Sequence, residues 1–185
     1  MSLRLPLRAV VSQKAVALAA QVLKDKYSGW TGPVTAAYAP GCVNIIGEHT
    51  DYNAGFVFPM CIELGTAVVG AKSPGNQVRI FSTAKQLELC CEVSSICEVD
   101  DVEKGAWTSY VKGTIAKFLE GYQELQGKPF DCPAFSAVVQ ASIPMGSGLS
   151  SSASLEVALM TFLEELSGCR FEPEKKARLC QAAGE

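Results

Sequence analysis

The chain has 185 residues, of which 48% are hydrophobic and 19% charged, and it carries a formal net charge of −3. This composition is typical of a folded globular protein that buries a sizeable core, and it excludes an intrinsically disordered chain. The mildly acidic balance gives no electrostatic reason to bind nucleic acid, and no apolar stretch of the sequence is long enough to cross a membrane. We therefore expect no nucleic-acid or membrane partner, and the sequence indicates no obligate protein partner.

The eight cysteines are not arranged as a disulfide framework. Cys90 and Cys91 are adjacent, no pair has the C-x-x-C spacing, and several of the others lie within apolar runs. Cysteines placed in this way are typical of small, reduced core residues in an intracellular protein. We therefore expect a cytoplasmic protein without disulfides.

The first half of the chain predicts one helix followed by strands. Ser12 is the expected N-cap of a helix that ends near Gly29. The apolar face of this helix consists of Ala15, Val16, Ala19, Val22, Leu23 and Tyr27. A strand over residues 34–39 is expected to close at Pro40 and Gly41. Further apolar runs cover residues 42–46 and 56–59, and three strands are expected over residues 64–71, 78–82 and 87–93.

The second half predicts helices on either side of one central strand. Apolar residues from Trp107 to Leu125 recur at helical spacing, and residues 135–143 are typical of a buried strand. A helix then continues over residues 155–166, and a last helix begins at Pro173 and runs to the end of the chain. This order of elements predicts one α+β lobe, with helices packed on a mixed or mainly antiparallel sheet.

The most informative segment joins the central strand to the helix that follows it. Residues 146–153 have the sequence Gly-Ser-Gly-Leu-Ser-Ser-Ser-Ala, directly after a strand that Pro144 ends. The two glycines allow a tight turn, and the serines stand where a helix should begin. A helix N-terminus after a glycine loop presents free backbone N–H groups to a phosphate. We therefore expect a nucleoside triphosphate site here.

The same loop also fits other descriptions. It is not a Walker P-loop, because no Gly-Lys-Ser/Thr follows four residues after a glycine. As a dinucleotide-binding fingerprint it lacks the third glycine. Taken alone, it also fits an ordinary strand-to-helix turn that a serine caps.

A second polar segment lies between Gly47 and Gly55 and contains Glu48, His49 and Asp51. On its own this loop could be solvated surface, because an exposed cluster of charges costs little. Two carboxylates and an imidazole could also bind a divalent metal, although such sites usually draw ligands from more than one segment. A Ser-His-Asp triad with His49 as base would need a nucleophile, and no G-x-S-x-G elbow is present. The remaining alternative is a fan of hydrogen-bonding groups for the hydroxyls of a sugar.

These segments resemble one known family. Residues 39–53 (APGCVNIIGEHTDYN) resemble the galactokinase signature, and residues 144–153 (PMGSGLSSSA) resemble the ATP motif of the GHMP small-molecule kinases. Residues 107–113 (WTSYVKG) resemble the galactokinase segment before that motif. The resemblance begins at about Val34, and the expected N-terminal helix and lead-in occupy residues 1–33 before it. Over residues 34–185 it implies the N-terminal domain of a GHMP kinase, a ribosomal-protein-S5-domain-2-like lobe, with the C-terminal lobe expected to be absent.

The resemblance also implies which residues bind which ligand. Glu48, His49 and Asp51 would hold the hydroxyls of galactose, with Thr50 in the same loop, and Trp107 would lie against the adenine of ATP. The ATP phosphates would be wrapped by Gly146, Ser147, Gly148, Leu149, Ser150, Ser151 and Ser152, the last of which would also bind Mg²⁺. The implied reaction transfers the γ-phosphoryl group of MgATP to the anomeric hydroxyl of galactose. Another GHMP sugar kinase, such as an N-acetylgalactosamine kinase, is the alternative.

Two departures from the family pattern bear on the expected activity. Cys42 stands where the family has an arginine assigned to stabilising charge around the reacting oxygens. The family's catalytic aspartate would lie beyond Glu185, and Glu185 itself is one position after the place of the family's metal-binding glutamate. We retain Glu185 as a candidate metal ligand and expect impaired or absent catalysis. The alternative function is a galactose- and ATP-binding sensor without turnover.

Overall fold

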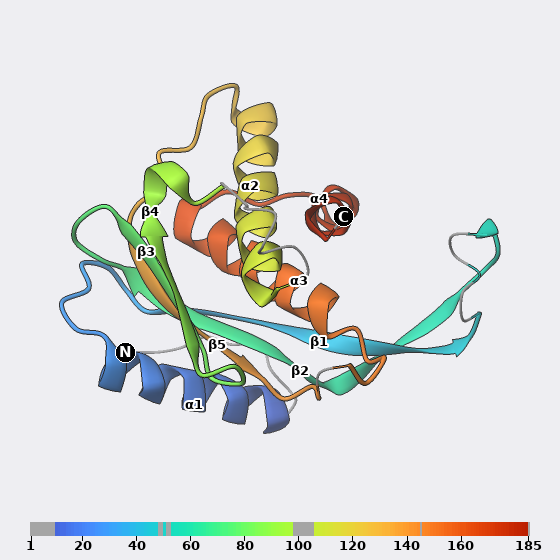
Figure 1. The fold of residues 1–185 in the computed structure, drawn as a ribbon. Coiled ribbons are helices and arrows are strands. Elements are labelled where there is room, and N and C mark those ends of the chain that lie inside the picture. Colours follow the sequence, from blue (N-terminus) through green and yellow to red (C-terminus); the bar gives the residue numbers. More distant parts are fainter. Residues whose placement is uncertain (1–9, 48–49, 51–52, 98–105, 145, 185) are drawn as a thin grey trace.

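The computed structural model describes residues 10–47, 50, 53–97, 106–144 and 146–184. Five strands form one sheet in the order β1-β2-β5-β3-β4, and helices cover both of its faces (Figure 1). Along the chain the elements are α1 (Val10–Lys26), β1 (Thr35–Ile46), β2 (Phe58–Lys72), β3 (Gln77–Ser82), β4 (Leu87–Glu92), the 3₁₀ turn η2 (Val93–Ser95), α2 (Trp107–Gln126), β5 (Phe135–Ala141), α3 (Ser151–Ser167) and α4 (Pro173–Ala183).

The sheet is mixed, which confirms the predicted α+β class. Neighbouring strands are antiparallel except β3 and β5, which run parallel. Residues 66–71 of β2 and 135–139 of β5 have neighbouring strands on both sides and are buried on both faces, so these stretches are largely apolar without a regular polar alternation. On β2, for example, Val68 faces one helix layer while Ala67 and Val69 face the other.

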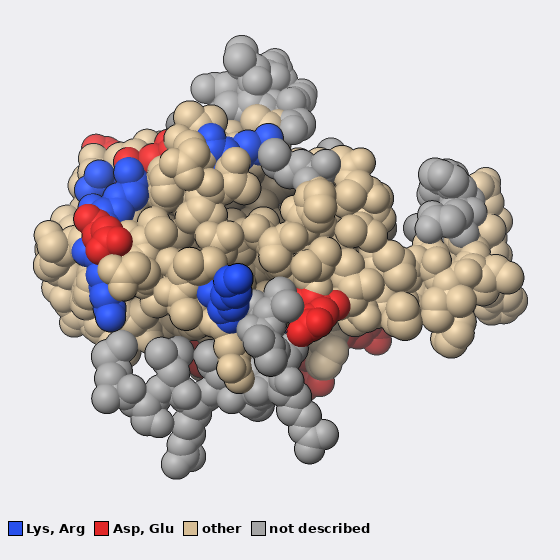
Figure 2. Space-filling model, turned by 90° about the horizontal axis from the view of Figure 1, so that it is seen from below, with Lys and Arg blue, Asp and Glu red and all other residues tan. Residues whose placement is uncertain are grey.

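The helices divide unequally between the two faces of the sheet. α2, α3 and α4 cover one face around a core that includes Phe118, Phe135 and Phe162, whereas α1 is the one described helix on the other face (Figure 1). Charged side chains gather at the end of this second face where α1 ends, at the left of Figure 2. Among the described residues, none of the helices has the length and apolar character that a membrane crossing requires.

The predicted start of the first helix is wrong by three residues, nearly one turn. α1 begins at Val10, so Ser12 is not an N-cap but an internal residue whose side chain is fully buried. Ser12 lies four residues before Val16, on the face that packs against the sheet, and this packing keeps the first turn helical despite the serine. The helix ends at Lys26, close to the predicted Gly29.

The predicted break at Pro40 and Gly41 is also wrong, because β1 continues through both residues to Ile46. β1 is an edge strand, and proline is tolerated there because its missing N–H can fall on the unpaired side. The irregularity remains visible as a shift in the pairing of β1 with β2, between Pro40 and Cys42. Residues 34–39 and 42–46 are therefore one strand with a bulge.

β1 and β2 extend beyond the sheet as a two-stranded arm (Figure 1). β2 pairs with β5 only over residues 66–72, so residues 58–65 are paired with β1 alone. The second half of the predicted apolar run at residues 56–59 is the start of β2, and the run lies on this arm and its tip. The exposed apolar side chains of the arm and its tip are Ile45, Ile46, Phe56, Val57, Phe58 and Met60.

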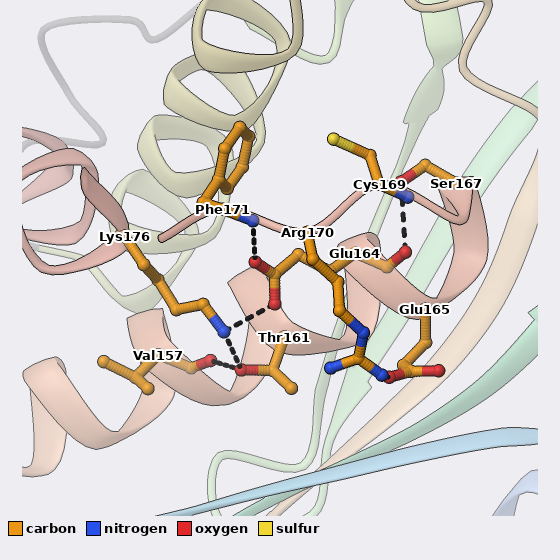
Figure 3. A network of polar contacts seen from close by, with 9 residues as sticks. All are labelled: Val157, Thr161, Glu164, Glu165, Ser167, Cys169, Arg170, Phe171 and Lys176. Carbon is orange, nitrogen blue, oxygen red and sulfur yellow. Dashed lines mark hydrogen bonds and ion pairs between the residues drawn. The ribbon is translucent and has the colours of Figure 1, made fainter. Parts of the chain in front are cut away.

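A buried carboxylate holds α4 against α3 (Figure 3). The Glu164 side chain is 1% exposed, and its Oε2 lies 2.5 Å from Nζ of Lys176 on α4. Its Oε1 accepts a hydrogen bond of 2.8 Å from the backbone N–H of Phe171, which lies in the α3–α4 connection. Lys176 also reaches Oγ1 of Thr161 at 3.4 Å. One charged side chain thus fixes both the path of the connection and the position of α4.

No disulfide joins any of the eight cysteines, as expected. Cys132, Cys169 and Cys180 are buried, and burial raises the pKa of the Cys132 thiol to about 11 and that of Cys180 to about 12. These three are small core residues. The same prediction is wrong for Cys61, Cys90 and Cys97, which are exposed because they lie on the arm, on the edge strand β4 and just after η2.

Replacing Lys176 with methionine tests the role of the buried ion pair. We expect the free energy of unfolding to fall by about 3 kcal/mol, because Glu164 would remain buried without its partner. The matched control is Lys175→Met, which removes an ion pair with Glu124 whose two side chains are 42% and 63% exposed and should cost about 1 kcal/mol or less. Urea unfolding measures both values, and equal losses would contradict the account.

Glu156 on α3 generates a prediction about pH. This residue is 5% exposed, and burial raises the pKa of its carboxyl from 4.5 to about 7. Between these values the unfolded chain releases a proton that the folded chain retains, so stability falls as pH rises from about 4.5 to 7 and is level outside that interval. The expected fall is on the order of 3 kcal/mol. Urea unfolding of the parent and of Glu156→Gln across this pH range measures the effect. The difference in their free energies of unfolding should change by this amount between pH 4.5 and 7, whereas parallel pH profiles of the two proteins would contradict the prediction.

Candidate functional site

The glycine-serine loop has a backbone shaped to bind an anion. Gly146, Gly148 and Ser150 have φ angles of 69°, 72° and 58°, whereas Ser147 and Leu149 between them are not in the left-handed region. An alternation of backbone handedness is also found in the anion-binding nests of other proteins, where it turns successive N–H groups toward a common side. A Cβ on either glycine would meet open space, so a lack of room is not what favours glycine at these positions. The left-handed backbone conformation favours it instead.

The start of α3 leaves its first N–H groups available. Ser150 occupies the N-cap position, but its side chain makes no capping hydrogen bond. The hydroxyl of this N-cap serine thus accepts no hydrogen bond from the backbone N–H groups at N2 and N3 of α3. The alternative of a serine-capped turn is therefore wrong. Holding a serine in the left-handed region costs about 1–2 kcal/mol, and strain of this kind is typical of functional loops.

The bulge of β1 fastens the loop to the sheet. A Cβ on Gly41 would lie 2.5 Å from the backbone oxygen of Leu149, so only glycine permits this approach. The N–H of Cys42 donates to the same oxygen at 3.4 Å. One turn into α3, the buried hydroxyl of Ser154 donates to the backbone oxygen of Ala39 at 2.8 Å. The backbone of the glycine-serine loop and the start of α3 are thus held by one short stretch of β1.

Cys42 points at the loop. Its half-buried thiol donates to Oγ of Ser150 at 3.0 Å. This contact supports the strained N-cap residue of α3. A thiol supplies neither the permanent positive charge nor the forked donors of the arginine that the family resemblance leads one to expect at this position.

A cavity of about 280 Å³ opens beside the N-terminus of α3. Ser151 and Ser152 line it from α3, and Trp107 lines it from the first turn of α2. The structure therefore brings together three residues that the sequence assigned to one nucleotide site. The predicted loop residues Gly146, Ser147, Gly148, Leu149 and Ser150 are not among the residues that line this cavity.

The cavity also contains residues that sequence reasoning missed. Tyr110 lies three residues after Trp107 on α2, and this helical spacing is a signal that could have found it. Lys85 lies in the turn between β3 and β4 and is the one charged residue among the described residues of the lining. Nothing in the local sequence indicates that this turn reaches the same cavity, because only the folding of the sheet brings it there.

The predicted sugar-binding residues lie mostly outside the described residues. This holds for Glu48, His49 and Asp51, whereas Thr50 is described. Oγ1 of Thr50 lies 2.7 Å from the backbone oxygen of Gly47 and 2.9 Å from that of Phe56, so its hydroxyl closes the loop at the tip of the arm. A contact of Thr50 with sugar stays a prediction.

The predicted metal ligands are only partly described. Ser152 lies at the cavity, whereas Glu185 is outside the described residues. Within the part of the chain that the structure describes, no three His, Cys, Asp or Glu side chains cluster as a metal site. A metal ion at Ser152 would therefore depend on ligand oxygens in addition to this hydroxyl.

Gly41→Ala tests how β1 holds the loop. The new methyl group would meet backbone, which cannot move aside as a side chain can, so we expect a loss of about 1–3 kcal/mol of stability and at least about tenfold weaker nucleotide binding. The matched control is Gly32→Ala, whose Cβ would lie 3.7 Å from its nearest neighbour, an ordinary contact. Thermal unfolding and calorimetric titration with MgATP measure the two effects. An unchanged nucleotide affinity in Gly41→Ala would contradict the role of β1 in holding the loop.

Comparison with known proteins identifies the same two segments. Residues 24–72 match the galactokinase galactose-binding signature, and residues 109–185 match the N-terminal domain of GHMP kinases. The galactokinases of Canis lupus familiaris and Homo sapiens are 41% and 42% identical to this chain, over 82% of this chain and 37% of each relative. The chain thus spans little more than a third of the length of these curated relatives.

Solved structures agree with these matches. Lactococcus lactis galactokinase, in its complex with galactose, has a TM-score of 0.74 and 29% identity, over 91% of this chain and 42% of that one. The mevalonate kinase of Methanococcus jannaschii has a TM-score of 0.68 at 16% identity, over 83% of this chain and 46% of that one, which shows a shared fold alone. Two family signatures and a common architecture show that the chain belongs to the galactokinase family of GHMP kinases and corresponds to the N-terminal portion of its members.

Proposed function

We propose that this chain forms the galactose- and ATP-binding part of a galactokinase, which transfers the γ-phosphoryl group of ATP to the anomeric hydroxyl of galactose. The observation that carries the proposal is the cavity in which Trp107, Ser151 and Ser152 meet at the uncapped start of α3. The match of residues 24–72 to a galactose-binding signature supports the choice of sugar. Support also comes from the Lactococcus lactis galactokinase, which was solved with galactose.

The residues of the cavity suit the parts of ATP. The indole of Trp107 offers a flat apolar surface for adenine, and Tyr110 adds a second ring on the same helix. The glycine-serine loop has no lysine, so its backbone N–H groups bind the phosphates, while Lys85 of the β3–β4 turn supplies a positive charge to the cavity. Ser152 would hold Mg²⁺ together with phosphate oxygens, and the metal when bound neutralises phosphate charge.

The proposed division of labour follows from the chemistry of phosphoryl transfer. Such a transfer needs little covalent help from the protein and is mostly positioning and charge stabilisation. Glu48, His49 and Asp51 would orient the sugar, because carboxylates and an imidazole match adjacent hydroxyls that each donate and accept a hydrogen bond. The hydroxyl of Thr50 closes the loop that carries them.

Cys42 favours a second candidate function, a sensor that binds galactose and ATP without turnover. The thiol contacts Ser150 and carries no permanent charge toward the reacting oxygens. Losing a positioned charge donor in such a site typically lowers the rate by about 10²- to 10³-fold. Ligand binding would survive this loss, because the loop backbone and Trp107 do not depend on it.

Calorimetry paired with an ADP-release assay tests the proposal and separates the two candidates. Galactose and a non-hydrolysable MgATP analogue should both bind. Trp107→Ala should lower the affinity for the MgATP analogue and leave the affinity for galactose unchanged. ADP release that depends on galactose supports the kinase, and binding without release supports the sensor. Failure of both ligands to bind would overturn both candidates.

Cys42→Arg tests the role of the missing charge. In a full-length galactokinase context we expect galactose phosphorylation to rise by about 10²- to 10³-fold, because a guanidinium replaces a neutral thiol beside the proposed phosphate loop. The matched control is Cys42→Ser, which keeps a small neutral donor to Ser150 and should leave the rate within a few-fold of the parent. Equal rates for Cys42→Arg and the parent would contradict this explanation.

A further inference from the structure

A second cavity, of about 290 Å³, lies on the α1 face of the sheet. It is lined by the end of α1, by the turn between β2 and β3, and by Ser136 near the start of β5. The glycine-serine loop follows the other end of β5, so the two cavities are separated by the length of this strand and by the sheet itself. We name this second cavity the α1 hollow.

The lining of the α1 hollow is polar and basic. Lys26 and Arg79 are its only charged residues among those described, and no carboxylate lines it. The remaining polar groups include three serine hydroxyls and the side-chain amides of Asn76 and Gln77. The charged side chains at the left of Figure 2 mark this end of the α1 face. Such a lining repels cations and offers little to an apolar ligand.

Both cations are held in place by aromatic rings. Nζ of Lys26 lies 4.4 Å from the ring centroid of Phe81, and Cζ of Arg79 lies 5.1 Å from the ring centroid of Tyr27. Tyr27 is itself fixed, because it is 5% exposed and its hydroxyl donates to Glu88. Cations held in this way lose less freedom when a ligand binds than free surface lysines do.

The two cations keep donors available for a ligand. Oε1 of Glu88 lies 3.5 Å from Nε of Arg79, which is a loose ion pair, and the Arg79 side chain remains 44% exposed to a ligand. Lys26 has no carboxylate partner in the part of the chain that the structure describes. A guanidinium fork and an ammonium group are the donors that bind phosphate oxygens.

We propose that the α1 hollow is a second ligand site, which binds the phosphate monoester of a small hydroxylated molecule such as a sugar or polyol phosphate. Lys26 and Arg79 bind the phosphate, and the serine hydroxyls and amides bind the hydroxyl groups of the ligand. The volume of about 290 Å³ is at the lower end of small-molecule sites, which suits a ligand of this size. This site is distinct from the nucleotide cavity and does not depend on the function proposed above.

The test must separate the α1 hollow from the phosphate loop. The chain has two tryptophans, Trp107 in the nucleotide cavity and Trp30, which lies two residues after Ser28 of the α1 hollow. Trp107→Phe therefore leaves Trp30 as the single indole reporter beside the hollow. Glycerol 3-phosphate, inorganic phosphate and glycerol are titrated into this variant at constant ionic strength, and the fluorescence of Trp30 is recorded.

We expect a saturable change in the fluorescence of Trp30 with glycerol 3-phosphate and no change with glycerol. Inorganic phosphate should bind with an affinity at least threefold lower than that of glycerol 3-phosphate. Lys26→Gln in the same background should lower the affinity for glycerol 3-phosphate at least tenfold. Adding Arg79→Gln to this variant should abolish saturable binding of glycerol 3-phosphate. The matched control is Lys24→Gln, which removes another basic residue of the last turn of α1 that does not line the hollow. Circular dichroism checks that each variant is folded.

Three results would overturn the proposal. The first is the absence of saturable binding by glycerol 3-phosphate. The second is equal affinity in folded Lys26→Gln and Lys24→Gln, which would place the ligand elsewhere. The third is equal affinity for glycerol 3-phosphate and inorganic phosphate, which would show that the hollow does not recognise the hydroxylated part of the ligand.

Discussion

The candidate site depends on the close approach of two backbones, where Gly41 of β1 meets the carbonyl of Leu149. A Cβ at residue 41 would lie 2.5 Å from that oxygen, and the Ser154 hydroxyl secures the same stretch of β1 at Ala39. These contacts hold a loop that would otherwise be a short, strained connection with exposed glycines. They also place Cys42, the residue that departs from the family pattern, directly against the N-cap of α3.

The same bulge connects the two halves of the proposed function. β1 passes from the sheet, past the glycine-serine loop, and into the arm that leads to the segment predicted to bind sugar (Figure 1). Within the sheet, β1 pairs with the buried second half of β2, which in turn pairs with β5. A rigid sheet edge of this kind can relate a sugar loop to a nucleotide loop, and phosphoryl transfer depends on such positioning. The α1 hollow, on the other face, uses a separate part of the sheet.

The sequence predicts most of the elements because their periodicity comes from packing. α2, α3 and the central strand were found from apolar spacing, and the glycine-serine loop from its chemistry. Local rules failed where tertiary contacts override them. Ser12 is helical because its face of α1 is packed, and Pro40 is in a strand because β1 lies at the sheet edge. Lys85 could not be found, because only the sheet brings its turn to Trp107.

The measurement that tests this account most directly is amide hydrogen exchange with and without a non-hydrolysable MgATP analogue. If the backbone of the loop and the start of α3 bind the phosphates, exchange should slow at residues 146–153 and at the β1 stretch that contacts them. Protection there, with little change around the end of α1, is the predicted result. Protection confined to other segments, or none at the start of α3 under saturating nucleotide, would contradict the assignment of this loop as the phosphate site.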